Sequence, residues 1–299
     1  MTETQVLVDG TLLPAASATI SALDRGFRSG EGVFETLRVR DRRAFRLAGH
    51  LDRLLGTAGR LGIALDRQAL GSGIAAVVAA NGHLGTDVIV RVTCSAGPLD
   101  IDRPFPGTGR SDAPPTVVIS VHPPTPGPVA PGPPARGLLV DLRRELAWAK
   151  STAYLVALVA QRLAVEQGAT DALLCDAQGA PLEAATANLF VILDQTLITP
   201  PVDAGVLAGV TRAAVLEVAP TCGLRADVRP LSRESLLVAD EALLTSAVSG
   251  LRPLTSVDGR PIGTGEPGPV TRQLSEAYTA LVAAEQRPVD DPVSWSSTG

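Results

Sequence analysis

The stretch HPPTPGPVAPGPPARG, residues 122–137, constrains the fold of this chain more than any other segment. Proline fixes φ and removes a backbone donor, so neither a helix nor a central strand continues through such a run. Its composition is typical of a linker between domains. We therefore expect a small amino-terminal α/β domain over residues 1–121 and a larger carboxy-terminal domain over residues 138–285. The polar remainder, residues 286–299, predicts a disordered tail.

Strand patterns alternate with helix patterns in both halves, which indicates an α+β fold. In the first half, TQVLVDGTLLP predicts a hairpin around Asp9-Gly10, and AGHLDRLLGTAGRLGI has the leucine spacing of an amphipathic helix. In the second half we expect strand LLVDL, a helix over residues 151–167 that ends at Gly168, and another helix after GVLAG.

Charge, cysteine use and apolar run length exclude several classes of function. The net charge of −5 argues against a nucleic-acid partner. No apolar run reaches the roughly 18 residues of a membrane span, and the first residues lack the pattern of a secretory signal. The three cysteines, Cys94, Cys175 and Cys222, are too scattered for a disulfide framework, and the three histidines lack ligand spacing. We expect a cytoplasmic protein without a metal site.

Lys150 is the one lysine of the chain, because the other 25 of its 26 basic residues are arginines. It follows Trp148-Ala149 and precedes an apolar helix pattern. A leftover lysine on a solvated surface would explain it. The alternative is chemical: a lysine amine can lose its proton and form a Schiff base, which arginine cannot do.

Three further positions carry chemistry that is ambiguous on its own. Glu183 lies among small apolar residues in GAPLEAATANLF, where a carboxylate is costly without a partner, although a loop glutamate is the simpler interpretation. Gly209-Val210-Thr211 begins a helix pattern, which predicts either an anion site or a threonine cap. Arg53 in GHLDRLLG suits a phosphate clamp or a surface salt bridge.

The order of these motifs resembles that of a known family. DRGFRSGEGVFETLRV, HLDRL, the lysine before a long helix, EAATANLF, GVLAGVTR and GLRPL follow one another as in the class IV aminotransferases, over roughly residues 5–260. This is the fold-type IV family of pyridoxal-phosphate enzymes, which includes D-amino acid aminotransferases, branched-chain aminotransferases and 4-amino-4-deoxychorismate lyases. The resemblance implies two α/β domains with pyridoxal 5'-phosphate in the cleft between them, and a homodimer.

The resemblance also assigns roles to individual residues. It implies that Lys150 forms the Schiff base with the cofactor and shuttles the proton, and that Glu183 pairs with the pyridine nitrogen. Tyr154, four residues after the lysine and on the same face if the helix starts early, resembles the tyrosine that binds the phenolic oxygen. The other cofactor contacts that it implies are Arg53, Val210, Thr211, Ser246, Ala247 and Asn188.

The sequence departs from the family at the substrate carboxylate. Phe34 stands where D-amino acid aminotransferases have a tyrosine, and their Arg-x-His pair falls on Ile101 and Arg103. Arg103, in a variable loop, is the first candidate for the carboxylate clamp. Arg38 on a strand is the second, and the backbone of Ala247-Val248 is the third. A loop arginine that moves would also admit primary amines.

These observations favour a transaminase that moves an amino group from an amino acid, expected to be a D-amino acid, to a 2-oxo acid. The first alternative is 4-amino-4-deoxychorismate lyase, although Ala153 replaces an asparagine that such lyases often carry. A branched-chain L-amino acid aminotransferase is the second, but TSAVSG differs from its usual Thr-Gly-Thr-Ala. A catalytically silent cofactor-binding or scaffold protein would not need Lys150 and Glu183.

Overall fold

The computed structural model describes residues 3–100, 113–124 and 133–296. The chain divides into two compact units. Unit 1 contains residues 1–125, 149–154 and 285–299, and unit 2 contains residues 126–148 and 155–284. The mixed strands and helices of both units confirm the α+β class. No helix of the described residues is long and apolar enough to cross a membrane.

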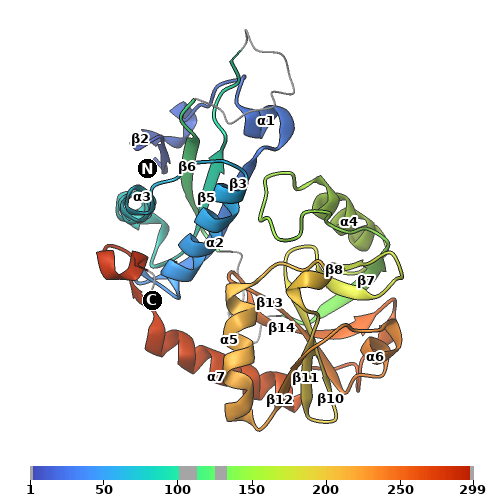
Figure 1. Cartoon of the computed structure of the whole chain (residues 1–299). Helices are drawn as coiled ribbons and strands as arrows, with labels where there is room; N and C mark the ends of the chain where they lie inside the picture. The colour runs from blue at the N-terminus through green and yellow to red at the C-terminus, as the bar shows by residue number, and fades with distance from the viewer. Residues whose placement is uncertain (1–2, 101–112, 125–132, 297–299) are drawn as a thin grey trace. The chain divides into compact units, whose positions relative to one another are not determined.

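Unit 1 is built on one antiparallel sheet (Figure 1). Its strands are β1 (Gln5–Val8), β2 (Thr11–Pro14), β3 (Gly32–Arg40), β4 (Arg43–Ala44), β5 (Asp87–Ser95), β6 (Thr116–His122) and β16 (Arg287–Pro288). They run in the order β16-β4-β3-β5-β6-β1-β2. The predicted hairpin joins β1 to β2, with Asp9 and Gly10 both at positive φ, as the tightest hairpin turns require.

Three helices accompany this sheet: α1 (Arg25–Ser29), α2 (Leu47–Arg60) and α3 (Arg67–Ala80). Successive side chains of a strand point to opposite faces. In β3, Val33, Leu37 and Val39 enter the core together with Leu51 and Leu54 of α2, while Phe34 is on the other face. The leucine spacing therefore predicted the helix and its buried face correctly at Leu51 and Leu54, whereas Leu61, the third leucine of the predicted stripe, follows the last helical residue.

The expectation of a disordered tail does not hold for Arg287–Ser296. Strand β16 pairs with β4, and the short helix η5 (Pro292–Trp295) follows it. Val289 and Trp295 are buried in the core of unit 1, and Trp295 Nε1 donates to Val289 O at 2.9 Å. The Trp295 ring packs so closely on Gly71 of α3 that a Cβ there would overlap it. Two apolar residues therefore order this segment by contacts far away in the sequence.

Unit 2 contains a second sheet. Its strands are β7 (Ala135–Val140), β8 (Asp171–Cys175), β9 (Pro181–Ala184), β10 (Asn188–Leu193), β11 (Thr196–Thr199), β12 (Arg225–Val228), β13 (Glu241–Ser246), β14 (Gly250–Val257) and β15 (Arg260–Pro261). They follow the order β12-β11-β10-β13-β14-β7-β8-β9, with β15 beside β14. Because β9 also pairs with β10, the six strands from β10 round to β9 form a closed ring.

Unit 2 also contains the helices α4 (Leu155–Glu166), α5 (Val210–Val218), α6 (Arg233–Leu237) and α7 (Pro269–Glu285). The last residue of α7, Glu285, already belongs to unit 1. Helix α4 connects the parallel strands β7 and β8. The helix expected from residue 151 begins only at Leu155. Part of the expected linker belongs to strands, since β6 ends at His122 and β7 starts at Ala135, while residues 125–132 lie outside the described part.

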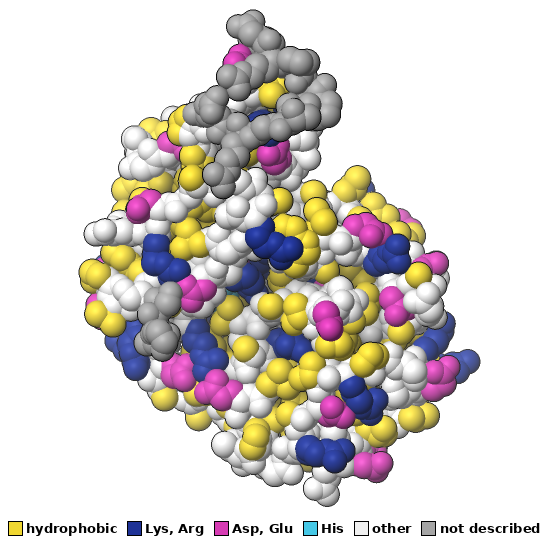
Figure 2. Space-filling model, viewed as in Figure 1, with side chains coloured by type: hydrophobic (Ala, Val, Ile, Leu, Met, Phe, Trp, Pro, Cys, Tyr) yellow, Lys and Arg dark blue, Asp and Glu magenta, His cyan; other side chains and the backbone are white. Residues whose placement is uncertain are grey.

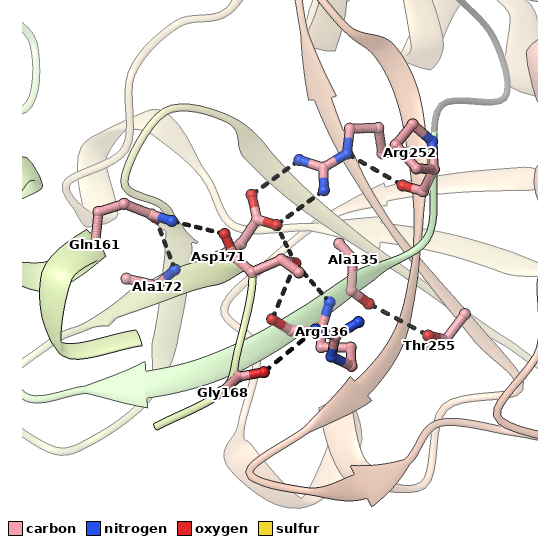
Figure 3. A network of polar contacts seen from close by, with 10 residues as sticks. Ala135, Arg136, Gln161, Gly168, Asp171, Ala172, Arg252 and Thr255 are labelled. Atoms are coloured by element: carbon pink, nitrogen blue, oxygen red, sulfur yellow. Dashed lines mark hydrogen bonds and ion pairs between the residues drawn. The ribbon is translucent and has the colours of Figure 1, made fainter. Parts of the chain in front are cut away.

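A polar network fixes the neighbouring strands of unit 2 (Figure 3). Arg252 of β14 reaches across β7 and donates to both oxygens of Asp171 at the start of β8, each at 3.0 Å. Gln161 of α4 donates to Thr170 O at 2.6 Å and accepts from Ala172 N at 3.3 Å. Figure 3 shows these groups converging on the first residues of β8. The network sets the register of β8 and the position of α4.

Candidate active site

Lys150 lies in a short segment of unit 1 that runs beside β3. Phe34 N donates to Lys150 O at 2.9 Å, and Thr152 N donates to Gly32 O at 2.9 Å. Ser151 forms a bridge with Val33. This pairing explains why the helix starts late: the backbone groups of the segment bind a strand instead. Lys150 and Tyr154 therefore do not lie on one helical face, as the spacing had suggested.

The side chains of this segment gather on the ring of Phe34, which is buried. Lys150 Nζ lies 4.7 Å from the ring centroid. The Tyr154 ring meets it edge-on, with centroids 5.4 Å apart and an interplanar angle of 83°. Three residues predicted for the site, Lys150, Tyr154 and Phe34, thus come together in unit 1.

Arg91 belongs to the same cluster and was missed by sequence reasoning. It lies on β5 opposite Thr36, and its guanidinium carbon is 3.8 Å from the Phe34 centroid. Burial lowers the pKa of Arg91, and the nearby Tyr154 acts in the opposite direction. The available signal was an arginine within the apolar strand DVIVRVTC. Half-buried cations of this kind suit an anionic ligand.

Arg53 is held by a buried carboxylate on the opposite face of β3 from Phe34. Its Nε and Nη2 donate to Glu35 at 2.6 and 2.8 Å, and His50 Nδ1 lies 2.9 Å from Glu35 Oε2. Burial alone would raise the pKa of Glu35, but the hydrogen bonds and charges of His50 and Arg53 lower it to about 2. The phosphate contact of Arg53 stays a prediction.

Of the two arginines predicted to bind the substrate carboxylate, the structure describes only Arg38. Arg38 donates to both oxygens of Asp87, with Nε at 2.7 Å and Nη2 at 2.5 Å, and these contacts lower the pKa of Asp87. Its guanidinium is thus already paired, as that of Arg53 is with Glu35, and its carboxylate contact stays a prediction. Arg103 lies outside the described residues.

In unit 2, Glu183 is 3% exposed and surrounded by donors. Its Oε2 accepts from Asn188 Nδ2 at 3.2 Å and from Leu207 N at 3.1 Å. Its Oε1 accepts from Arg144 Nη2, a contact that the sequence did not suggest. Asn188 also donates to Leu207 O at 2.9 Å. The predicted pair Glu183 and Asn188 thus lies together where β9 meets β10 and closes the ring of strands.

The groups predicted to bind an anion lie near the junction of β9 and β10. Asn188 is in register with Thr245, the residue before Ser246, and a Cβ on Gly209 would overlap Asn188 Oδ1. Gly209 is the N-cap of α5, and no side chain of the described residues caps that helix. The amides that begin α5 belong to Val210 and to buried Thr211.

The turn after β13 brings a second set of polar groups to the same strand ends. Ser249 N donates to Ser246 Oγ at 3.1 Å, which shapes the turn containing Ala247 and Val248. An uncapped helix start, a polar turn and a buried carboxylate are the groups that a phosphorylated heterocycle with a protonated ring nitrogen requires. The described residues of unit 2 therefore fit such a molecule.

Comparison with known proteins agrees with this chemistry. The family described as "Amino-transferase class IV" matches residues 32–257. A putative branched-chain-amino-acid aminotransferase of Methanocaldococcus jannaschii is 29% identical over 92% of this chain and 95% of its own length. A D-alanine aminotransferase of Bacillus licheniformis is 27% identical over 94% of this chain and 98% of its own length.

Solved structures share the fold. A branched-chain amino acid aminotransferase from T.th., complexed with N-(5'-phosphopyridoxyl)-L-glutamate, superposes with a TM-score of 0.85 and 26% identity. The alignment covers 96% of this chain and 99% of that one.

Proposed function

Since the chain belongs to the class IV aminotransferase family, we propose that it transfers an amino group from an aliphatic amino acid to a 2-oxo acid. Enzymes of this family use pyridoxal 5'-phosphate, which, when bound, withdraws electrons from the substrate and carries the amino group. The observation that carries the proposal is Glu183, a buried carboxylate beside the uncapped start of α5. A protonated pyridine nitrogen suits this carboxylate, and a phosphate suits the free N–H groups of the helix start.

The residues have separate roles in this proposal. Lys150 would hold the cofactor through its amine and would carry the proton to and from the substrate carbon. Glu183 would pair with the protonated ring nitrogen, and Asn188 orients Glu183. Val210, Thr211 and the Ser246–Val248 turn bind the phosphate or a substrate carboxylate through N–H and O–H donors. Arg53 remains the proposed side-chain phosphate anchor.

Arg91 is a new candidate for binding the substrate carboxylate. It is a half-buried cation on the ring of Phe34, which Lys150 also contacts. Arg38, in contrast, already forms an ion pair with Asp87. We expect Arg91→Gln to raise KM for the amino acid and the 2-oxo acid about tenfold or more, the usual range for losing a charge-assisted bond. An unchanged KM would contradict this role for Arg91 and would leave Arg103 as the candidate that binds the substrate carboxylate.

The names of the relatives support an aliphatic donor, since alanine and the branched-chain amino acids have such side chains. The D-isomer expected from the sequence is supported by the D-alanine aminotransferase, and the L-isomer by the branched-chain enzymes. The phosphopyridoxyl-glutamate complex of the T.th. enzyme supports 2-oxoglutarate as acceptor. A screen of D- and L-amino acids against 2-oxoglutarate and pyruvate separates the two donors.

The decisive experiment uses the fact that the chain has one lysine. Borohydride treatment of the loaded protein should bleach its visible band and leave the cofactor mass on the peptide containing Lys150. Lys150→Ala should lose the adduct and turnover, and Lys150→Arg should keep the charge but not the adduct. Full activity in either variant would exclude the proposal. Pyruvate release from aminodeoxychorismate without an amino acceptor would instead identify the lyase alternative.

We also propose that the protein acts as a homodimer in the cytoplasm. Helix α4 buries small alanines but exposes Leu155, Leu158 and Leu163 by 69, 48 and 41%. Apolar side chains reach the surface beside charged ones in the region of α4 (Figure 2). Such an outward apolar stripe is typical of an interface. Leu158→Asp should yield monomers by light scattering, whereas Val293→Asp, at an exposed site of unit 1, should not.

A further inference from the structure

Arg144 lies against the carboxylate that the cofactor ring is proposed to need. Its Nη2 donates to Oε1 of Glu183, and both residues belong to unit 2. The Arg144 side chain is 16% exposed and that of Glu183 is 3% exposed. Arg144 is in the connection after β7, outside the sequence stretches on which the family resemblance was based. The ion pair is thus a feature of this chain that the proposed function does not explain.

The two oxygens of Glu183 have different partners. Oε2 is bound by Asn188 and Leu207 N, which belong to the framework of strands β9 and β10 and the loop before α5. Oε1 is bound by a long and flexible side chain. A buried carboxylate is strongly disfavoured without a cation, so Glu183 needs a positive partner whether or not a cofactor is present. A protonated ring nitrogen and a guanidinium supply the same single charge.

We propose that Arg144 is an exchangeable counter-ion, which neutralises Glu183 in the cofactor-free protein and leaves Oε1 when the protonated ring nitrogen of the cofactor binds there. This inference rests on the proposed function. The exchange keeps one cation on Glu183 in each state, so the buried carboxylate is never uncompensated. Arg144 then stabilises the empty protein and competes with the cofactor. The Arg144 side chain is 16% exposed, so the protein does not fully enclose it.

The test compares Arg144→Gln with Arg143→Gln. Glutamine keeps a hydrogen-bond donor but removes the charge. Arg143 is the matched control, because it is the neighbouring arginine, is 50% exposed and pairs with Glu145. Cofactor-free protein is prepared from each variant. Thermal unfolding is then measured with and without pyridoxal 5'-phosphate, and the dissociation constant is measured by titration of the visible band.

Competition predicts that the substitution destabilises the cofactor-free protein and strengthens cofactor binding. Cofactor-free Arg144→Gln should unfold at a lower temperature than the wild type, and the loaded proteins should unfold at similar temperatures. The dissociation constant should fall about tenfold or more, because a charge-assisted bond no longer has to be broken. Arg143→Gln should match the wild type in all three measurements. Arg144→Lys, which keeps the charge with a poorer geometry, should give intermediate values.

Weaker cofactor binding in Arg144→Gln would overturn the inference, because it would mean that Arg144 supports the loaded site. An unchanged dissociation constant would overturn it as well. If Arg144→Gln folds only when the cofactor is present, the stabilising half of the inference is supported and Arg144→Lys tests the competition. Failure of the wild type to bind the cofactor would instead contradict the proposed function.

Discussion

At the scale of single residues, Glu35 is a carboxylate buried in unit 1 between two basic side chains. It is 1% exposed and is contacted by His50 and Arg53. Its pKa is lowered from 4.5 to about 2, with His50 and Arg53 overcoming the opposing effect of burial. A depressed pKa means that the folded state binds the charged form better than the unfolded state does.

Glu35 should therefore contribute stability above pH 4.5 that is lost as the pH falls towards 2. The contribution is about 3 kcal/mol at pH 7, as the size of the shift implies. Urea unfolding of the wild type and Glu35→Gln should differ most near pH 7 and progressively less below pH 4.5. A difference between the two proteins that does not change with pH would contradict this assignment.

The role of Arg53 is better tested with lysine than with alanine, because alanine would remove the guanidinium that pairs with buried Glu35. Arg53→Lys keeps a charge beside Glu35 but loses the forked geometry that binds Glu35 through Nε and Nη2. If Arg53 also holds the phosphate, this variant should lose cofactor several-fold faster on dialysis, with little change in the choice of amino donor. Unchanged retention would make Arg53 purely structural.

At the scale of elements, a carboxylate of β13 fixes the start of α7. Glu241 accepts from Val270 N and Thr271 N, each at 2.8 Å, and it is 9% exposed. A Cβ on Gly268 would overlap the Glu241 carboxyl group, so the chain passes directly over it. A negative charge at this end of a helix satisfies free N–H groups and the helix dipole.

Glu241→Gln should lower the free energy of unfolding by about 1–2 kcal/mol, because a charged cap becomes neutral. Asp290→Asn is the control, since Asp290 forms an exposed ion pair with Arg42. That change should cost clearly less, because an exposed ion pair contributes little to stability. Chemical denaturation of both variants measures the difference. Equal losses would mean that Glu241 does not act as a cap.

Periodic patterns predicted most elements, but contacts between distant residues decided the exceptions. Alternation and leucine spacing predicted β1, β3 and α2 because each of these buries one face against a neighbour. The same patterns failed for Ser151–Tyr154, where pairing with β3 replaces the first helical turn. Trp295 orders the tail through Gly71, which is more than 200 positions earlier.

The candidate site was predictable where a residue type is rare or a motif is distinctive. Lys150 stands out as the chain's one lysine, and Glu183 and Asn188 share a motif. Arg144 was missed because nothing in the sequence sets it apart from the other 24 arginines, and Arg91 was missed although it interrupts the apolar strand DVIVRVTC. Their contacts distinguish them, one with Phe34 and the other with Glu183.

At the scale of the whole molecule, unit 1 is assembled from three separate stretches of chain. The last of them places Trp295 in the core that α2 and α3 help to form. Trp295→Ala should cost about 3–5 kcal/mol, the range for removing a large buried aromatic side chain. Thermal unfolding and limited proteolysis after residue 284 measure the loss. A cost below about 1 kcal/mol would mean that the tail is dispensable.

The stretch that carries Lys150 enters unit 1 for only six residues, 149–154, and the tail returns there from residue 285. This arrangement has a consequence for synthesis on the ribosome. A nascent chain that has just emerged to residue 125 contains neither the partner of Gly32–Phe34 nor Trp295. Completion of unit 1 must wait for residues 285–296, after unit 2 has been made. Lys150 can therefore pair with β3 only after β7, the first strand of unit 2, has been made.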